Sequence, residues 1–74
     1  MEAIYKLESY VYPIRSPRNG MEYWEIKFAK INDTYFGGAQ CLNFDLSIDF
    51  RNLDTRDESV AIDTIVSTIK ENLV

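Results

Sequence analysis

The sequence predicts an α+β fold: a three- to four-stranded antiparallel β-meander with one C-terminal α-helix packed on one face. Three observations support this fold. Two strand-like segments flank a turn at residues 16–20, apolar and polar residues alternate over residues 42–50, and an amphipathic stretch follows residue 55. A chain of 74 residues has the size of one domain, so residues 1–74 are expected to form a single β-β-β-α domain.

The first half of the chain is expected to form a β-hairpin. Residues 2–12 make the first strand, because β-branched and aromatic residues dominate its second half. Pro13 then ends the strand or occupies an edge position, since proline has no N–H to donate. Residues 16–20 form the turn, because their proline presets φ and their Asn-Gly pair tolerates positive φ. The second strand, residues 21–31, returns antiparallel to the first.

The predicted centre of the core is the segment of residues 42–50. Its alternate positions are apolar: Leu42, Phe44, Leu46, Ile48 and Phe50. Alternate residues of a strand point to the same face, so the pattern predicts a half-buried central strand. A turn at residues 32–33 precedes this region, and the pair Gly37 and Gly38 interrupts it with a bulge, a bend or a short loop. The pattern leaves open whether residues 34–50 form one bent strand or two.

The C-terminal stretch has the pattern of an amphipathic helix. Thr55 and Glu58 have the spacing of a capping box, which predicts Thr55 as the N-cap. Apolar residues then recur every three or four positions: Ile62, Ile65, Val66, Ile69 and Leu73. This spacing gathers them in one stripe, which we expect to pack on the sheet. A helix of about 18 residues is about 27 Å long, which matches a strand of about 30 Å.

Histidine and cysteine, the usual ligands of zinc, are scarce in this sequence. The sequence contains no histidine and a single cysteine, Cys41, which excludes an intrachain disulfide and a zinc site made of cysteine and histidine. We therefore expect no metal and no cofactor. Cys41 shares strand parity with Asn43, so its thiol is expected to face outward, and no neighbouring cations indicate a reactive thiolate.

Three features of the sequence indicate where in the cell the protein is expected. No run approaches the roughly 18 apolar residues of a membrane span, so we expect no membrane partner. The first ten residues include acids and other polar residues, unlike a signal peptide. A single cysteine agrees with a reducing compartment, and we expect a cytoplasmic protein.

The charge of the chain is negative and uneven. The net charge is −4, with +1 in residues 1–32 and −5 in residues 33–74. Duplex nucleic acids are bound mainly through cationic contacts to phosphates, so an acidic chain is a poor candidate for that role.

No pattern indicates catalysis. Asp45 and Asp49 would lie about 13 Å apart on one strand face, which is too far for the carboxylate pair of a glycosidase. The glycine pair at residues 37–38 lacks the sequence of a phosphate-binding loop. We therefore expect a protein without enzymatic activity.

The aromatic residues of the first half suggest a binding surface. One helix cannot cover both faces of the sheet, so several tyrosines are expected to be exposed beside arginines, a combination enriched in interface hot spots. The predicted protein-binding residues are Tyr10, Tyr12, Arg15, Arg18, Tyr23, Tyr35, Asp45 and Asp49. The two aspartates are expected to steer the partner during association, and the tyrosines or arginines to hold it.

The sequence therefore predicts a small protein-binding module, a regulator or inhibitor that occupies a partner protein's surface, of the kind that phages and mobile elements encode. An alternative is an RNA or single-stranded DNA binder that uses a Tyr/Arg sheet face. Another is a structural homo-oligomer subunit. Self-association is expected in each case, because the core is small, no disulfide stabilises it, and one sheet face is left uncovered.

Overall fold

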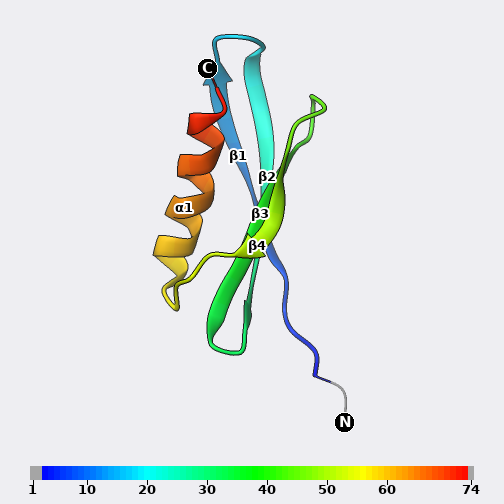
Figure 1. Cartoon of the computed structure of the whole chain (residues 1–74). Coiled ribbons are helices and arrows are strands. Elements are labelled where there is room, and N and C mark those ends of the chain that lie inside the picture. The colour runs from blue at the N-terminus through cyan, green and yellow to red at the C-terminus, as the bar shows by residue number, and fades with distance from the viewer. Residues whose placement is uncertain (1–2, 74) are drawn as a thin grey trace.

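The computed structural model describes residues 3–73, and within them the chain forms a four-stranded antiparallel sheet and one helix (Figure 1). The strands are β1 (Glu8–Ser16), β2 (Gly20–Ile31), β3 (Thr34–Cys41) and β4 (Ser47–Asn52), and the helix is α1 (Glu58–Glu71). The strands lie side by side in the order of the sequence. The predicted α+β meander with a helix on one face is confirmed.

The first hairpin follows the predicted turn but not the predicted strand limits. β1 begins at Glu8 and continues through Pro13, which pairs with Tyr23. The edge position of β1 explains why proline is tolerated, because one side of this strand has no neighbour to bond. Residues 3–7 precede β1 outside the sheet, and Glu2 of the predicted strand lies outside the described residues. Gly20 has a φ of 76°, as the turn requires.

The segment of residues 42–50 is not a central strand. β3 ends at Cys41, a loop covers residues 42–46, and β4 begins at Ser47 as the other edge of the sheet. The residues expected to fill the core are exposed or half-buried: Leu42, Phe44 and Phe50 are exposed, and Leu46 and Ile48 are half-buried. Two strands, rather than one bent strand, therefore form the region from residue 34 onward.

A polar side chain accounts for the loop. The Asn43 amide donates to the carbonyl of Met21 at 3.0 Å, and its Oδ1 accepts from the Tyr23 N–H at 3.1 Å. These bonds hold the chain beside the start of β2 instead of letting it extend as a strand. The same oxygen lies 3.3 Å from Cys41 Sγ, and Cys41 is buried in the core, so the expectation of an outward thiol is wrong.

The core lies between the sheet and α1. Its fully buried large side chains are Trp24, Phe28, Ile65 and Ile69. Gly37 lies beneath the helix, and a Cβ there would be 2.8 Å from Ile65 Cδ1, so glycine allows α1 to approach the sheet closely. The register of β3 and β4 shifts between Gly37 and Ala39, which confirms a bulge at the glycine pair.

The helix begins later than predicted. Asp57 is the N-cap, and its carboxylate accepts from the N–H groups of Ser59 and Val60. Thr55 instead accepts from the Asp57 N–H at 3.1 Å and shapes the turn before the helix, so its prediction as N-cap is wrong. The predicted apolar stripe faces the sheet over the length of α1, with Ile65 and Ile69 fully buried, whereas Leu73 follows the helix. Ala61, one turn before Ile65, is also fully buried.

Candidate functional site

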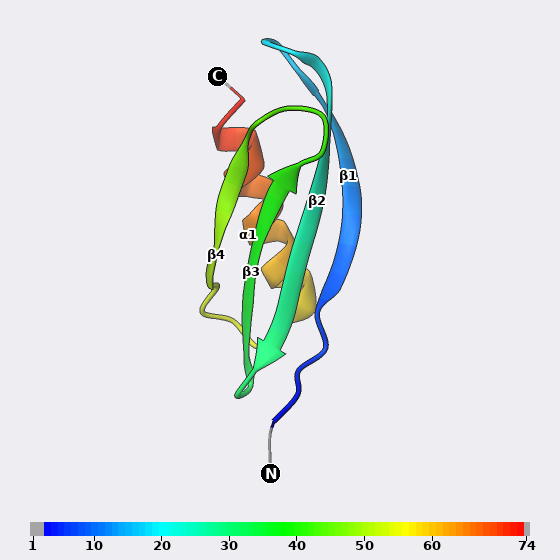
Figure 2. The same ribbon diagram turned by 90° about the vertical axis from the view of Figure 1, so that its right-hand side faces the viewer.

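The face of the sheet opposite α1, here called the open face, has no covering element among residues 3–73. Figure 2 views the sheet from this side, with α1 behind it. Strand alternation together with the register assigns the residues of this face. Its larger apolar side chains are Val11, Met21, Tyr23, Ile31 and Phe36.

Leu42 and Phe50 extend the apolar part of the open face. The Leu42 N–H donates to the Tyr23 carbonyl at 2.7 Å, which continues the pairing of β2 and β3 by one residue and places Leu42 beside Tyr23. Phe50 lies at the bulge, where it lines a pocket together with Lys27. The exposed fractions are 57% for Val11, 43% for Tyr23, 56% for Leu42 and 49% for Phe50.

The pocket at the bulge is shallow and has a volume of about 240 Å³. It is lined by Lys27, Gly38, Ala39, Gln40, Ser47, Ile48, Asp49 and Phe50. Sites for small molecules and cofactors usually have volumes of roughly 300–1,000 Å³. The pocket therefore has the size for one side chain of a docked protein rather than for a cofactor.

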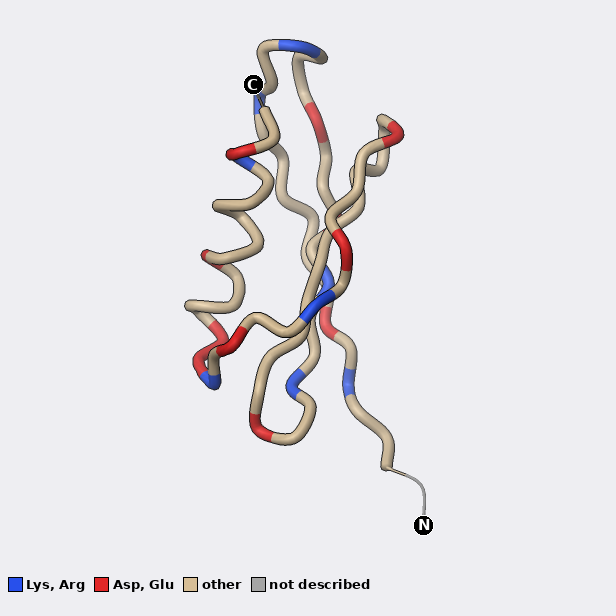
Figure 3. The backbone as a smooth tube through the Cα atoms, viewed as in Figure 1, with Lys and Arg blue, Asp and Glu red and all other residues tan. Residues whose placement is uncertain are grey.

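The open face is close to electrically neutral. Strand alternation places Arg15, Glu25 and Lys27 on it, and Asp49 lines its pocket. Glu25 and Lys27 pair within the face at 3.7 Å. Figure 3 shows acids gathered elsewhere, around the start of α1, where the sequence has Asp54, Asp57 and Glu58. These acids around the start of α1 thus lie on the side of the molecule away from the open face.

The predicted tyrosines do not share one face. Tyr23 lies on the open face, whereas Tyr10, Tyr12 and Tyr35 alternate onto the helix side. The ring of Tyr10 packs 5.7 Å from that of Phe28, and the Tyr35 ring lies 6.0 Å from it. Tyr10 is 52% exposed, and Tyr12 and Tyr35 are half-buried. Tyr10 and Tyr23 are thus two exposed tyrosines on opposite sides of the molecule.

The environment of Tyr35 is acidic and partly apolar. Burial, followed by the negative charges of Glu58, Glu8 and Asp57, raises the pKa of its phenol above the ordinary value. Lys30 Nζ lies 5.8 Å from the ring centroid, which is within the range of a cation–π contact. The phenol is therefore neutral at physiological pH.

The predicted aspartates are separated by the loop. Asp45 lies in the segment between β3 and β4, and Asp49 lies in β4. Both are exposed. The expectation that they share one strand face is wrong, because residues 42–46 leave the sheet.

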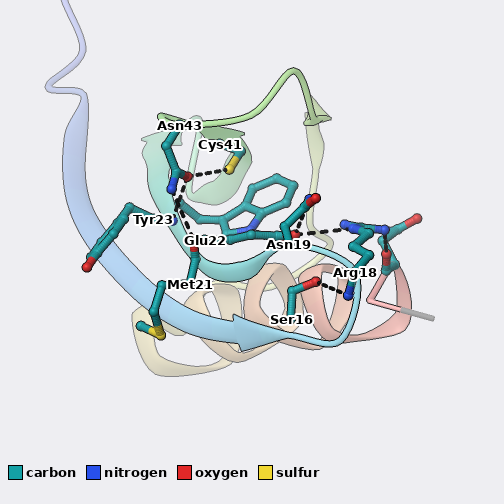
Figure 4. Close-up of polar contacts among 10 residues, drawn as sticks. Ser16, Arg18, Asn19, Met21, Glu22, Tyr23, Cys41 and Asn43 are labelled. Atoms are coloured by element: carbon teal, nitrogen blue, oxygen red, sulfur yellow. Dashed lines mark hydrogen bonds and ion pairs between the residues drawn. The ribbon is translucent and has the colours of Figure 1, made fainter.

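Arg18 belongs to a polar cluster around a carboxylate that the sequence interpretation missed (Figure 4). Glu22 is fully buried. Its Oε1 accepts from Trp24 Nε1 at 2.9 Å, and its Oε2 accepts from Asn19 Nδ2 at 2.9 Å and from Arg18 Nε at 3.2 Å. Arg18 also donates to the carbonyl of Asn72, just after α1. The cluster fastens the β1–β2 turn to the end of the helix.

The carboxylate of Glu22 stays ionised despite its burial. Burial alone would raise its pKa, but hydrogen bonds from Trp24, Asn19, Arg18 and Ser16 outweigh that effect and lower the pKa to about 2. Among residues 3–73, no buried side-chain nitrogen or oxygen lacks a hydrogen-bond partner. Every strong acceptor in the cluster is therefore engaged by the fold.

Comparison with known proteins finds no matching family model, no similar curated protein and no similar solved structure. In the part of the chain that the structure describes, no three Cys, Asp or Glu side chains are grouped to hold a metal ion. Within residues 3–73, the helix α1 lacks the length and the apolar character needed to cross a bilayer.

Proposed function

We propose that this chain is a non-enzymatic protein-binding module whose contact surface is the open face of the sheet. The observation that supports this proposal is the set of large apolar side chains exposed on that face, Val11, Tyr23, Leu42 and Phe50, opposite a face that α1 covers. Large apolar side chains exposed together on one face are typical of interaction sites in small proteins. A module of this size acts by occupying a partner's surface, as a regulator or an inhibitor does.

The charges favour a protein over a nucleic acid as the partner. A single-stranded nucleic acid would stack on Tyr23 and Phe50, but it also needs cations along its phosphates. The open face offers Arg15 and Lys27, and Glu25 already pairs with Lys27. The alternative of an RNA or single-stranded DNA binder therefore lacks the cationic groove that such binding requires.

Two exposed tyrosines provide a matched test of the contact surface. A photo-crosslinking amino acid is placed at Tyr23 or at Tyr10 in cells that encode the protein, and the crosslinked partner is identified. Surface plasmon resonance then compares Tyr23→Ala with Tyr10→Ala on that partner. Tyr23→Ala is expected to raise the dissociation rate at least tenfold, because anchors at interface centres typically contribute 2 kcal/mol or more, and Tyr10→Ala should change it little.

The same assay tests the role of the acidic residues. Replacing Asp45 and Asp49 by lysine is expected to slow association and weaken its salt dependence, while dissociation changes little, because charges at the rim act mainly on the encounter. An effect of Tyr10→Ala without an effect of Tyr23→Ala would contradict the open face as the contact surface. Tight binding to single-stranded oligonucleotides at low salt, lost in Tyr23→Ala, would favour the alternative.

A further inference from the structure

We infer that the partner of the open face is a second copy of this chain, so that two sheets pack face to face around a two-fold axis. The inference rests on the proposed function, since both use the open face. The sheet presents Val11, Tyr23, Leu42 and Phe50 to solvent, and a second copy would bury all four on each side. Packing of two sheets through apolar faces is a common way to form a core about 10 Å thick.

The distribution of charge suits a second copy. Two chains of net charge −4 repel one another, but the acids around the start of α1 lie on the side away from the open face. Face-to-face packing keeps these acids apart. In a two-fold contact each pair of residues occurs twice, so the neutral set of Arg15, Glu25, Lys27 and Asp49 can place opposite charges against each other.

The open face is large enough for a specific contact between two copies of the chain. The strands have 9, 12, 8 and 6 residues, an average close to nine, which corresponds to about 30 Å. Four strands at about 4.8 Å spacing are about 19 Å wide. The planar area is then about 600 Å² in each copy and about 1,200 Å² in the pair, at the lower end of specific interfaces. An interface of that size is large enough for a specific dimer, while its affinity depends on how well the apolar side chains fit.

The edges of the sheet are less suited to self-association than its face. β1 contains Pro13, which cannot donate to a neighbouring strand. β4 has only six residues and borders the bulge at Gly38. Proline, short edge strands and bulges are the devices by which proteins prevent edge-to-edge pairing.

Sedimentation velocity of the full chain between 1 and about 100 µM tests the inference. We expect the mass to rise from 8.6 kDa toward twice that value over this range. Tyr23→Glu and Phe50→Glu should each raise the dissociation constant more than tenfold, because each places a charge in the apolar contact. The matched control is Val60→Glu, since Val60 is 46% exposed on α1, and it should leave association unchanged. Circular dichroism verifies that each variant is folded.

The outcomes separate this inference from the proposed function. A chain that remains at 8.6 kDa at 100 µM overturns the dimer, and crosslinking of Tyr23 to a different protein would then still support the protein-binding module. A dimer that Val60→Glu dissociates, and that neither Tyr23→Glu nor Phe50→Glu affects, overturns the dimer through the open face and contradicts the proposed contact surface as well.

Discussion

Replacing Glu22 by glutamine should make the protein less stable in a way that depends on pH. The pKa of Glu22 lies at about 2 instead of the ordinary 4.5. At about 1.4 kcal/mol for each pH unit, this difference corresponds to about 3 kcal/mol of stability at neutral pH. Arg18, one of the donors, has a side chain that is 32% exposed, so solvent weakens part of the effect, and about 2 kcal/mol is the expected value.

The sign of the pH dependence follows from the lowered pKa. Ionised Glu22 stabilises the folded state above about pH 4.5, and this contribution is lost as the pH falls toward 2. In Glu22→Gln one amide oxygen replaces two carboxylate oxygens that accept from Trp24, Asn19 and Arg18, so a buried donor loses its partner. The variant should therefore be less stable than the wild type at pH 7, and the difference should shrink toward pH 2.

Urea denaturation at pH 7, 5, 3 and 2, followed by the fluorescence of Trp24, measures this difference. The protein concentration is kept constant, because association would add to the apparent stability. The control is Glu8→Gln, since Glu8 lies off the open face, pairs with the exposed Lys6 at 3.8 Å and should contribute about 1 kcal/mol or less. A difference between wild type and Glu22→Gln that is equal at pH 7 and pH 2 would refute the reasoning.

Three further predictions, made with single substitutions, test the fold. Gly38→Ala should destabilise the protein by about 1–3 kcal/mol in chemical denaturation, because the new Cβ would lie 2.7 Å from the Ile48 carbonyl oxygen, and a wild-type midpoint would show that the bulge yields easily. Ile65→Ala should cost about 2–5 kcal/mol of stability and Leu46→Ala only about 1 kcal/mol, since Ile65 is buried and Leu46 half-buried. A lower melting temperature for Leu46→Ala than for Ile65→Ala would show that the core is not where the structure places it. Asp57→Ala should cost about 1 kcal/mol through loss of the N-cap, and an equal or larger effect of Thr55→Ala would restore Thr55 to that role.

The sequence was sufficient for the fold class because its signals are local. The turn at residues 16–20, the alternation of Trp24, Ile26 and Phe28 in β2, and the apolar stripe of α1 each depend on neighbouring residues only. Such signals determine the type and order of elements and the side of β2 that is buried. They also correctly required a bulge, a bend or a short loop at the glycine pair.

The errors arose where distant residues decide the structure. Alternation over residues 42–50 predicts a strand, but the bonds from Asn43 to Met21 and Tyr23, about twenty positions away, hold the chain in a loop. The burial of Glu22 was missed for another reason: its donors Trp24, Asn19 and Arg18 are close in sequence, but a strand pattern does not show that their side chains converge on one carboxylate. The one available signal in the sequence was that Glu22, a charged residue, has the same strand parity as the buried Trp24.

The sequence predicts an exposed sheet face as the binding surface, but it predicts only some of the residues that lie on that face. The single helix does leave one face of the sheet uncovered, and Tyr23 and Arg15 lie on that face. Leu42 and Phe50 were assigned to the core, because an apolar residue in an alternating segment has the same pattern whether it faces a helix or a partner. The polar residues between them were the available signal for a loop.

The position of α1 in the sequence has a consequence for synthesis of the chain. All four strands leave the ribosome before α1, so for a time the sheet has no cover on either face. Trp24, Ile26 and Phe28 are then as accessible as the open face is in the finished molecule. A nascent chain in this condition is prone to aggregate and is a substrate for chaperones. Productive folding is therefore expected to be completed only once Ile65 and Ile69 have left the ribosome and can reach the sheet.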